Sequence, residues 1–384
     1  MECFVIFVMA WCWFNATESK PQNVGGNIIA KQKIETIMAY IILALLITII
    51  LSILIFLKLK SNSSNNSIMN QEQLRKECKK FFWCETISDC QDLLDIYTEF
   101  FFDAIMNHNE DVFTHAEADA KIVIQMMMTK ALHLKEVLNG VEFQTKTGRK
   151  LNKIIDPTIV ASLIRNIYET TGMFNLIYRE AKNNDEREII YLLWVHAGLS
   201  YRQRFDSIIT TVENKEKSEQ EKKQLEGIKK SIEENNLFKK LDEKNQGKIL
   251  TKLKEKDYLL RFNNLEVEFL NWRELVKSMH IKEGKLDHIY TYFSLYSHPS
   301  NVAVFQYANM FEKGNESYPD LVKFNLQIAF MMFSIFIADY IKLFPAVLTT
   351  YEKMGLVEQI VINFHNTQAR SHEYDINDSW KATG

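Results

Sequence analysis

Apolar residues run without a charge from position 36 to position 57 (TIMAYIILALLITIILSILIFL), and Lys58 and Lys60 follow them. A hydrocarbon core of about 30 Å takes roughly 20 apolar residues in a helix. The stretch is therefore long enough to cross a bilayer once. We expect residues 36–57 to form a single transmembrane helix that holds the rest of the chain at a lipid bilayer.

A second apolar stretch, at residues 3–14 (CFVIFVMAWCWF), is too short to span a bilayer. It is similar to the core of a signal peptide, although Glu2 precedes it in place of a lysine or arginine. In either case we expect residues 1–35 to lie outside and the body inside. Basic residues are also more frequent after residue 57 than before residue 36, which favours a cytoplasmic body. A signal anchor with an exported body is the alternative.

The rest of the chain shows the periodicity of helices. Residues 58–84 contain the polar run SNSSNNS and are predicted to be a linker. We expect a helical domain at residues 85–345, followed by a C-terminal helix and tail at 346–384. Residues 142–152 predict a loop or a small hairpin. The expected helices cover residues 87–106, 116–138, 157–181, 186–208, 259–280, 285–298, 319–344 and 345–364.

Two of these segments need separate interpretation. Residues 213–256 are rich in lysine and glutamate with a thin apolar seam, a pattern typical of a solvated helical arm. Residues 326–344 are nearly apolar enough for a second span, but Asp339 and Lys342 lie within them. Because a charge inside a span costs about 3 kcal/mol, we expect residues 326–344 to form a buried core helix.

Composition also favours an all-α fold. The 384 residues include only 12 glycines and 5 prolines, which disfavours a turn-rich β fold. The net charge of −3 provides no global basic field for sequence-independent nucleic-acid binding. Cys78, Cys84 and Cys90 are spaced more widely than zinc ligands usually are. We expect free thiols of a reduced compartment, no metal site and no cofactor.

Candidate chemistry lies on two of the expected helices. The first begins at Asp156 and Pro157, a capping residue followed by a residue that suits the first helical turn. On one face of it lie Ser162, Arg165, Glu169 and Gly172, and apolar residues fill most of the remaining surface. A helix that is apolar nearly all round is buried, so Arg165 and Glu169 are expected to be buried as a pair or to border a cleft.

The second helix ends near Pro299 and carries its own polar stripe, Asp287, Thr291, Ser294 and His298. A Ser-His stripe facing the Arg-Glu pair would make a polar pocket within a helical bundle. Such a pocket suits a small polar ligand or a phosphodiester, or acid–base chemistry through His298. The alternative is a hydrogen-bonded network that only fixes the register of the helices.

These two helices resemble a bacterial family, domain of unknown function 5677, through the motifs LIRNIYE (163–169) and YSHPS (296–300). The resemblance covers roughly residues 85–345, whose helical body is similar to the HEPN superfamily. It implies a bacterial protein of the inner (cytoplasmic) membrane that dimerises and acts in stress or phage defence. Many HEPN-like proteins are metal-independent ribonucleases. The positions that the resemblance marks as characteristic are Arg165, Glu169, Ser294 and His298.

The HEPN ribonuclease signature is an arginine followed, after four to six residues, by a histidine on one helix. His298 has no arginine at that spacing, and the only instance is Arg273 with His280 in RELVKSMH. Residues 108–119 (HNEDVFTHAEAD) are expected to form a solvated loop. His365 and His372 are expected to lie in a frayed tail.

Three functions are therefore open. The first is a membrane-anchored, cytosolic helical module that binds or senses an unknown ligand, with a homodimer or another protein as partner. The second is a membrane-tethered ribonuclease, for which RNA would be the substrate. In the third, the charged arm at 213–256 is the functional surface and the pocket is only core.

Overall fold

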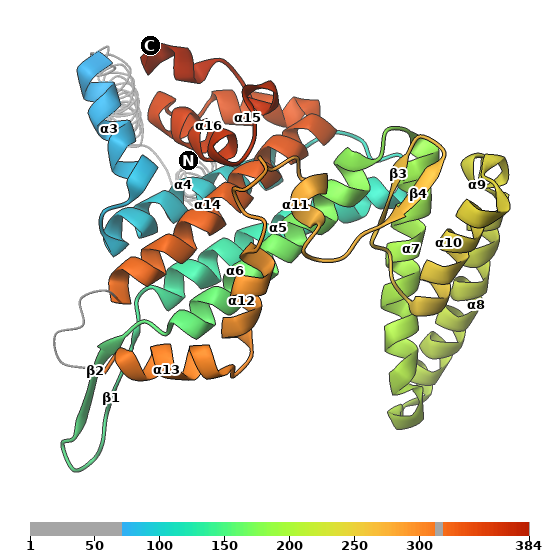
Figure 1. The fold of residues 1–384 in the computed structure, drawn as a ribbon, viewed down its shortest axis with the longest axis horizontal. Helices are drawn as coiled ribbons and strands as arrows, with labels where there is room; N and C mark the ends of the chain where they lie inside the picture. Colours follow the sequence, from blue (N-terminus) through green and yellow to red (C-terminus); the bar gives the residue numbers. More distant parts are fainter. Residues whose placement is uncertain (1–70, 312–317, 384) are drawn as a thin grey trace, which may run out of the picture. The chain divides into compact units, whose positions relative to one another are not determined.

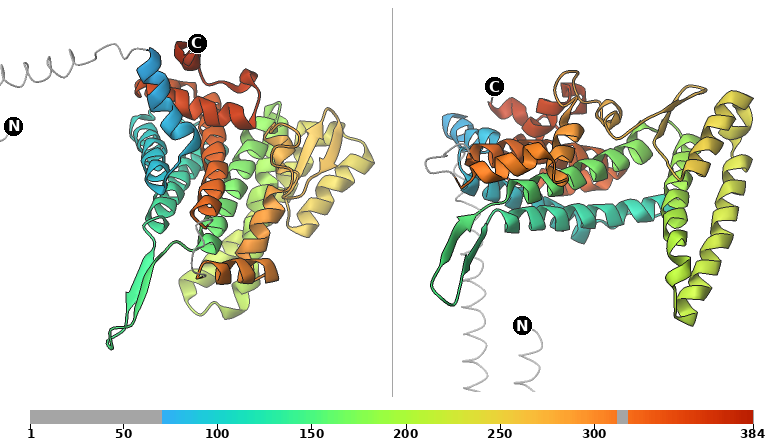
Figure 2. Two further views of the ribbon diagram at one scale, coloured as in Figure 1. Left: turned by 60° about the vertical axis from the view of Figure 1, so that its left-hand side comes forward. Right: turned by 60° about the horizontal axis from the view of Figure 1, so that its bottom comes forward.

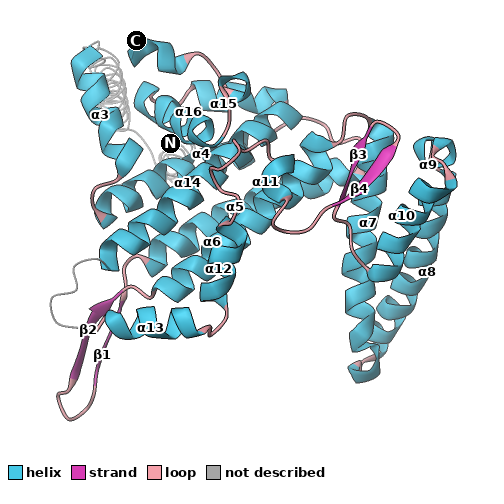
Figure 3. Ribbon diagram, viewed as in Figure 1, coloured by secondary structure: helices cyan, strands magenta, loops and turns pink. Residues whose placement is uncertain are grey.

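The computed structural model describes residues 71–311 and 318–383. The chain divides into two units, residues 1–70 and 71–384, and the described residues belong to the second unit. This unit is mostly helical, and two short hairpins are the only sheets among its described residues (Figure 3). The predicted all-α class agrees with this architecture. The expected external segment 1–35 and transmembrane helix 36–57 lie outside the described residues.

A bundle of long helices forms the core of this unit. Its members are α4 (Ile87–Asn107), α5 (His115–Val137), α6 (Pro157–Asn175), α12 (Ile289–Ser297) and α14 (Tyr318–Leu343). α6 packs against α5, α12 and α14, and α4 packs against α5 and α14 (Figure 1). α6 therefore lies at the centre of the bundle.

Local signals place the starts of these helices. Thr86 and Thr114 each form a capping box at the starts of α4 and α5. Asp156 caps α6 through its side chain, and Pro157 lies in the first turn of that helix, as predicted.

α14 contains the stretch that we considered as a second span. Among the described residues, Pro319–Leu343 is the one helical segment long and apolar enough to cross a membrane, and 72% of its most apolar window is buried inside the protein. Phe330, Phe333 and Phe336 are fully buried and contact rings of α4 such as Tyr97 and Phe101. This burial agrees with the prediction of a core helix.

The charged segment 213–256 forms a helical arm, as predicted. It consists of α8 (Val212–Glu234), α9 (Asn236–Lys240) and α10 (Glu243–Glu255), and it packs on α7 (Asn184–Arg202) (Figure 2). Ile228 and Ile232 of the apolar seam are buried. Most lysines and glutamates of the arm are exposed.

The helix predicted at residues 259–280 is wrong. This segment forms an antiparallel hairpin, β3 (Leu260–Asn263) with β4 (Glu266–Phe269), and then the short helix α11 (Leu275–Ser278). Leu260, Phe262 and Val267 are buried, and their alternation has the period of a strand. Asn264 turns the chain with a φ of 57°, a left-handed conformation that asparagine tolerates.

The remaining elements are short. β1 (Val141–Gln144) and β2 (Lys150–Ile154) form the small hairpin that was one alternative for residues 142–152. The C-terminal helix expected at 345–364 is divided between η3 (Pro345–Val347), α15 (Leu348–Glu352) and α16 (Leu356–Ala369). The others are the π-helix η1 (Leu176–Glu180), η2 (Gln203–Ile208), α13 (Asn301–Asn309), η4 (His372–Tyr374) and η5 (Ser379–Thr383).

The predicted linker 58–84 and C-terminal segment 346–384 are not separate from the helical body. The linker region includes α3 (Gln71–Trp83), which packs against α16, and α16 packs against α14. Leu74 and Cys78 of α3 are buried because their spacing of four residues places them on one face. Residues 71–84 and 346–383 therefore belong to the same compact unit as residues 85–345.

His365 corrects the expectation of a frayed tail, because its side chain is fully buried in α16. Its Nε2 lies 3.1 Å from the carbonyl oxygen of Phe81, and its Nδ1 has no hydrogen-bond partner among the described residues. A charged imidazolium would need acceptors for two N–H groups. Burial accordingly lowers the pKa of His365 to about 4. His372, in contrast, is exposed.

A buried ion pair connects the end of α16 to α14. Arg370 is 0% exposed and Asp339 is 3% exposed. The Nη1 and Nη2 groups of Arg370 donate to the two oxygens of Asp339 at 2.9 and 2.8 Å, and its Nε donates to the carbonyl of Met279 at 2.7 Å. Asn175, at the end of α6, donates to Asp339 at 2.9 Å, and Arg179 of η1 lies 3.5 Å from it.

Replacing Arg370 by methionine is expected to lower the free energy of unfolding by about 3–5 kcal/mol, because Asp339 is left buried without its main partner. Urea unfolding of the full-length protein in detergent, followed by circular dichroism, measures this change. The control Lys381→Met removes the exposed pair with Asp378 and is expected to cost less than about 1 kcal/mol. Equal effects of the two substitutions would contradict the role given to Arg370.

Acidification is expected to destabilise the protein through His365. Its pKa is lowered in the folded state, so between about pH 6.5 and pH 4 the unfolded chain takes up a proton that the buried ring does not. Stability is therefore lost as pH falls, by about 2 kcal/mol from pH 7 to pH 5. His365→Gln should remove this part of the pH dependence of urea unfolding, whereas His372→Gln should keep it. Parallel pH curves for wild type and His365→Gln would refute the assignment.

Candidate functional site

Four side chains meet where α6 packs against α12, and we call them the α6–α12 cluster: Arg165, Glu169, Tyr290 and His298. The Nε of Arg165 donates to Glu169 Oε1 at 3.0 Å, one helical turn further along α6. Its Nη2 donates to the hydroxyl of Tyr290 at 2.6 Å. Its Nη1 lies 3.4 Å from Nε2 of His298, the residue that follows α12. Each of the three guanidinium nitrogens thus lies beside a different neighbour.

The cluster borders the surface. The side chains of Arg165 and Glu169 are 21% and 27% exposed, and His298 is exposed. Partial burial raises the pKa of Tyr290, although the positive charge of Arg165 opposes that shift. Burial also lowers the pKa of the nearby Lys130 on α5, and Glu169 opposes that shift. The cluster is therefore a charged site that water and small solutes can reach at His298.

The structure thus brings three of the four characteristic residues together and leaves Ser294 aside. The hydroxyl of Ser294 donates to the carbonyl of Tyr290 in its own helix at 2.7 Å. Ser162 likewise donates to a carbonyl of its own helix, that of Thr158 at 2.8 Å. Gly172 has a packing role, because a Cβ atom there would lie 2.6 Å from the side chain of Leu275 in α11.

Arg273 and His280 do not share a helix, because α11 covers only Leu275–Ser278 between them. Arg273 is exposed. His280 has a φ of 56°, lies 3.3 Å from Glu180, and stacks on Tyr374 with ring centroids 5.3 Å apart. The ribonuclease signature requires an arginine and a histidine on one helix. The structure therefore contradicts the assignment of this signature to Arg273 and His280.

Sequence reasoning missed Tyr290 and Trp272. Tyr290 precedes Ser294 by four residues and His298 by eight, so the helical spacing used for those two residues also places Tyr290 beside them. Trp272 stacks on Tyr290 with ring centroids 6.3 Å apart. It lay inside the helix wrongly predicted at 259–280, so no spacing argument related it to this site.

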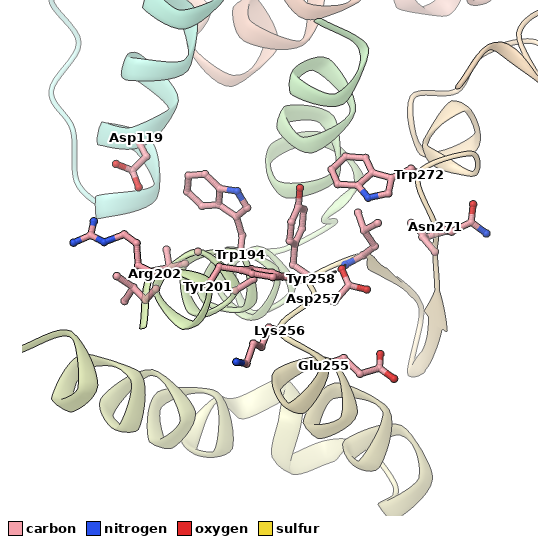
Figure 4. A pocket seen from close by; sticks show the side chains of 16 residues that line it. Asp119, Trp194, Tyr201, Arg202, Glu255, Lys256, Asp257, Tyr258, Asn271 and Trp272 are labelled. Atoms are coloured by element: carbon pink, nitrogen blue, oxygen red, sulfur yellow. Dashed lines mark hydrogen bonds between the residues drawn. The ribbon is translucent and has the colours of Figure 1, made fainter. Parts of the chain in front are cut away.

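Trp272 also lines a neighbouring cleft of about 950 Å³, which we call the aromatic cleft. Residues of α7, the end of α10 and the segments flanking the β3–β4 hairpin form its walls, and Asp119 of α5 contributes at one side (Figure 4). The size is that of a small-molecule site. Its aromatic wall residues are Trp194, Tyr201, Tyr258 and Trp272.

No group of three or more histidine, cysteine, aspartate or glutamate side chains is arranged to hold a metal ion among the described residues. Within the predicted loop 108–119, His108 is hydrogen-bonded to Tyr340 at 2.8 Å, and a helix starts at His115. Cys78, Cys84 and Cys90 are free and buried, and burial raises the pKa of Cys78 to about 11. The Cys78 thiol is therefore a poor nucleophile and a poor metal ligand.

The α6–α12 cluster can bind an acidic group, because Arg165 and His298 present adjacent nitrogens at an accessible edge. Comparison with known proteins adds no family to this picture: no protein-family model matches the chain, and no curated protein or solved structure is significantly similar to it.

Proposed function

We propose that this protein is a membrane-anchored helical module that binds or senses a small ligand with an acidic group at the α6–α12 cluster. The observation that carries this proposal is the position of Arg165, whose guanidinium is fixed by Glu169 and Tyr290 beside the exposed ring of His298. A guanidinium held in this way has already lost much of its side-chain freedom, so less entropy is lost when a ligand binds.

The acidic class follows from the chemistry of the two nitrogens. Arg165 Nη1 is always a donor, and His298 Nε2 is a donor whenever it carries the proton. An oxygen of a phosphate or carboxylate placed at this edge can accept from both groups, which lie 3.4 Å apart. A role in bacterial stress or phage defence and a homodimer remain proposals that rest on the family resemblance. A cytoplasmic body remains a proposal that rests on the basic residues after residue 57.

A ribonuclease is the second candidate. The same 3.4 Å approach of Arg165 to His298 joins a guanidinium, which can stabilise a phosphorane-like charge, to a candidate acid–base group. Metal-independent cleavage of RNA requires both functions. Binding remains the favoured proposal because the sequence lacks the Arg–His spacing on one helix.

The diribonucleotide uridylyl-(3′→5′)-uridine distinguishes the two candidates, because it carries one phosphodiester that is both an anion and a cleavable bond. We expect titration calorimetry with the full-length protein in detergent to show saturable binding, and chromatography to show uncleaved dinucleotide. Arg165→Lys should weaken binding about tenfold, roughly 1.4 kcal/mol, because lysine lacks the fixed guanidinium fork. The matched control is Arg149→Lys, an exposed arginine beside the β1–β2 turn, which should leave binding unchanged.

Cleavage that is lost in His298→Ala, with loss of RNA integrity in cells that express the wild type, would establish the ribonuclease instead. Absence of both binding and cleavage would refute an acidic-ligand site. If His298→Ala unfolds, the network serves only the fold; we expect its circular dichroism to match that of the wild type.

Membrane attachment is tested by deleting residues 36–57. We expect the wild type to sediment with membranes and to resist extraction by carbonate, because an apolar helix of this length does not leave the bilayer under these conditions. The deletion variant should appear in the supernatant. The control deletes residues 3–14 and should stay with the membranes. Release of the wild type by carbonate would overturn the anchor.

A further inference from the structure

The aromatic cleft contains ring faces arranged around an open volume. Tyr258 and Trp272 stand edge to face, with ring centroids 6.2 Å apart and planes at 87°, and therefore form two walls of a corner. In Figure 4 the ring of Tyr258 lies between those of Trp194, on α7, and Trp272. All three side chains are half-buried. A ligand bound in the cleft can therefore contact more than one aromatic ring.

Two rings already carry cations: Tyr201 in the cleft wall and Tyr290, which stacks on Trp272. The guanidinium of Arg204 lies 4.5 Å from the ring centroid of Tyr201, and that of Arg165 lies 4.8 Å from the ring centroid of Tyr290. In the part of the chain that the structure describes, no lysine or arginine lies over the rings of Trp194, Tyr258 or Trp272. No cation of the described residues thus competes with a ligand for the negative faces of these three rings.

Carboxylates outnumber cations among the charged residues of the cleft, which are Asp119, Glu255, Asp257, Arg202 and Lys256. Arg202 is paired with Glu221 and Asp257 with Lys252. Asp119, Glu255 and Lys256 then leave one negative charge. Lys256 lies on the side of Tyr201 that faces away from Trp272 (Figure 4).

We infer that the aromatic cleft is a second binding site and that it takes an organic cation with a quaternary or alkylated ammonium group. Such a group has a diffuse charge that is weakly hydrated, so its attraction to the faces of tryptophan and tyrosine is not offset by a large desolvation cost. An anion would instead be repelled by the carboxylates. A neutral ligand would gain nothing from the negative charge of Asp119. The inference does not depend on the function of the α6–α12 cluster.

Choline and its uncharged isostere 3,3-dimethylbutan-1-ol test this inference, because they differ only in having N⁺ or carbon at the centre of the trimethyl group. Both are titrated calorimetrically into the full-length protein in a maltoside detergent. We expect choline to bind saturably and at least about tenfold more tightly than the alcohol.

Two substitutions locate the site. Asp119→Asn keeps the shape of the side chain and an acceptor for Tyr191, whose hydroxyl donates to Asp119 at 2.8 Å. This substitution should weaken the binding of choline about threefold or more. Its control is Asp111→Asn, an exposed acid outside the cleft. Trp272→Leu should weaken choline about tenfold, and Trp83→Leu, outside the cleft and 61% exposed, should have no effect.

Equal affinity for choline and the alcohol, or no saturable binding of choline, would overturn the cation assignment. Tighter binding of adenosine monophosphate that Trp272→Leu weakens would overturn it in favour of an anion. Asp119→Asn should also leave the binding of the diribonucleotide to the α6–α12 cluster unchanged. A loss of both ligands in this variant would show that the cleft is not an independent site.

Discussion

The ion pair between Arg370 and Asp339 is the interaction on which the arrangement of the bundle depends. Two charges without access to water are tolerated only when their hydrogen bonds are nearly all made. Here each of the three nitrogens of the Arg370 guanidinium donates a hydrogen bond, and the carboxylate of Asp339 also accepts from Asn175. These hydrogen bonds fix the ends of α6, α14 and α16 relative to one another. Arg165 lies upstream on the same α6, so this pair helps to hold the helix that carries the candidate site.

Some of the fold was predictable because its causes are local. The start of α6 at Asp156 and Pro157, the charged arm and the core position of α14 all follow from patterns within one segment. Asp339 marked α14 as a core helix, but its partner lies 31 residues away, in a polar segment that resembles a tail. The burial of His365 and of Arg370 in that segment was therefore not predicted. The β3–β4 hairpin was missed because its short alternation, Leu260 and Phe262, was read at the helical period.

The candidate site shows the same limit. Helical spacing identified Arg165, Glu169 and His298 as candidates, and the structure brings the three side chains together. Their role in a site stays a prediction. Residue spacing within one helix cannot predict the cleft, because its walls come from α5, α7, α10 and the segments before β3 and after β4. Only tertiary packing places Trp272 between the cleft and Tyr290. That shared tryptophan is a physical connection through which occupancy of one site can influence the other.

The order of Asp339 and Arg370 along the chain also has a consequence for biosynthesis. Domains form as the chain emerges from its N-terminal side, so α14 leaves the ribosome before the segment that completes its charge pairing. During that interval an apolar helix whose Asp339 lacks its main partner is exposed to chaperones, to other nascent chains and to any nearby bilayer. Asp339 opposes its entry into lipid, and the arrival of Arg370 closes the bundle. Synthesis of the segment that follows α14 is therefore also the step that commits α14 to the interior of the protein.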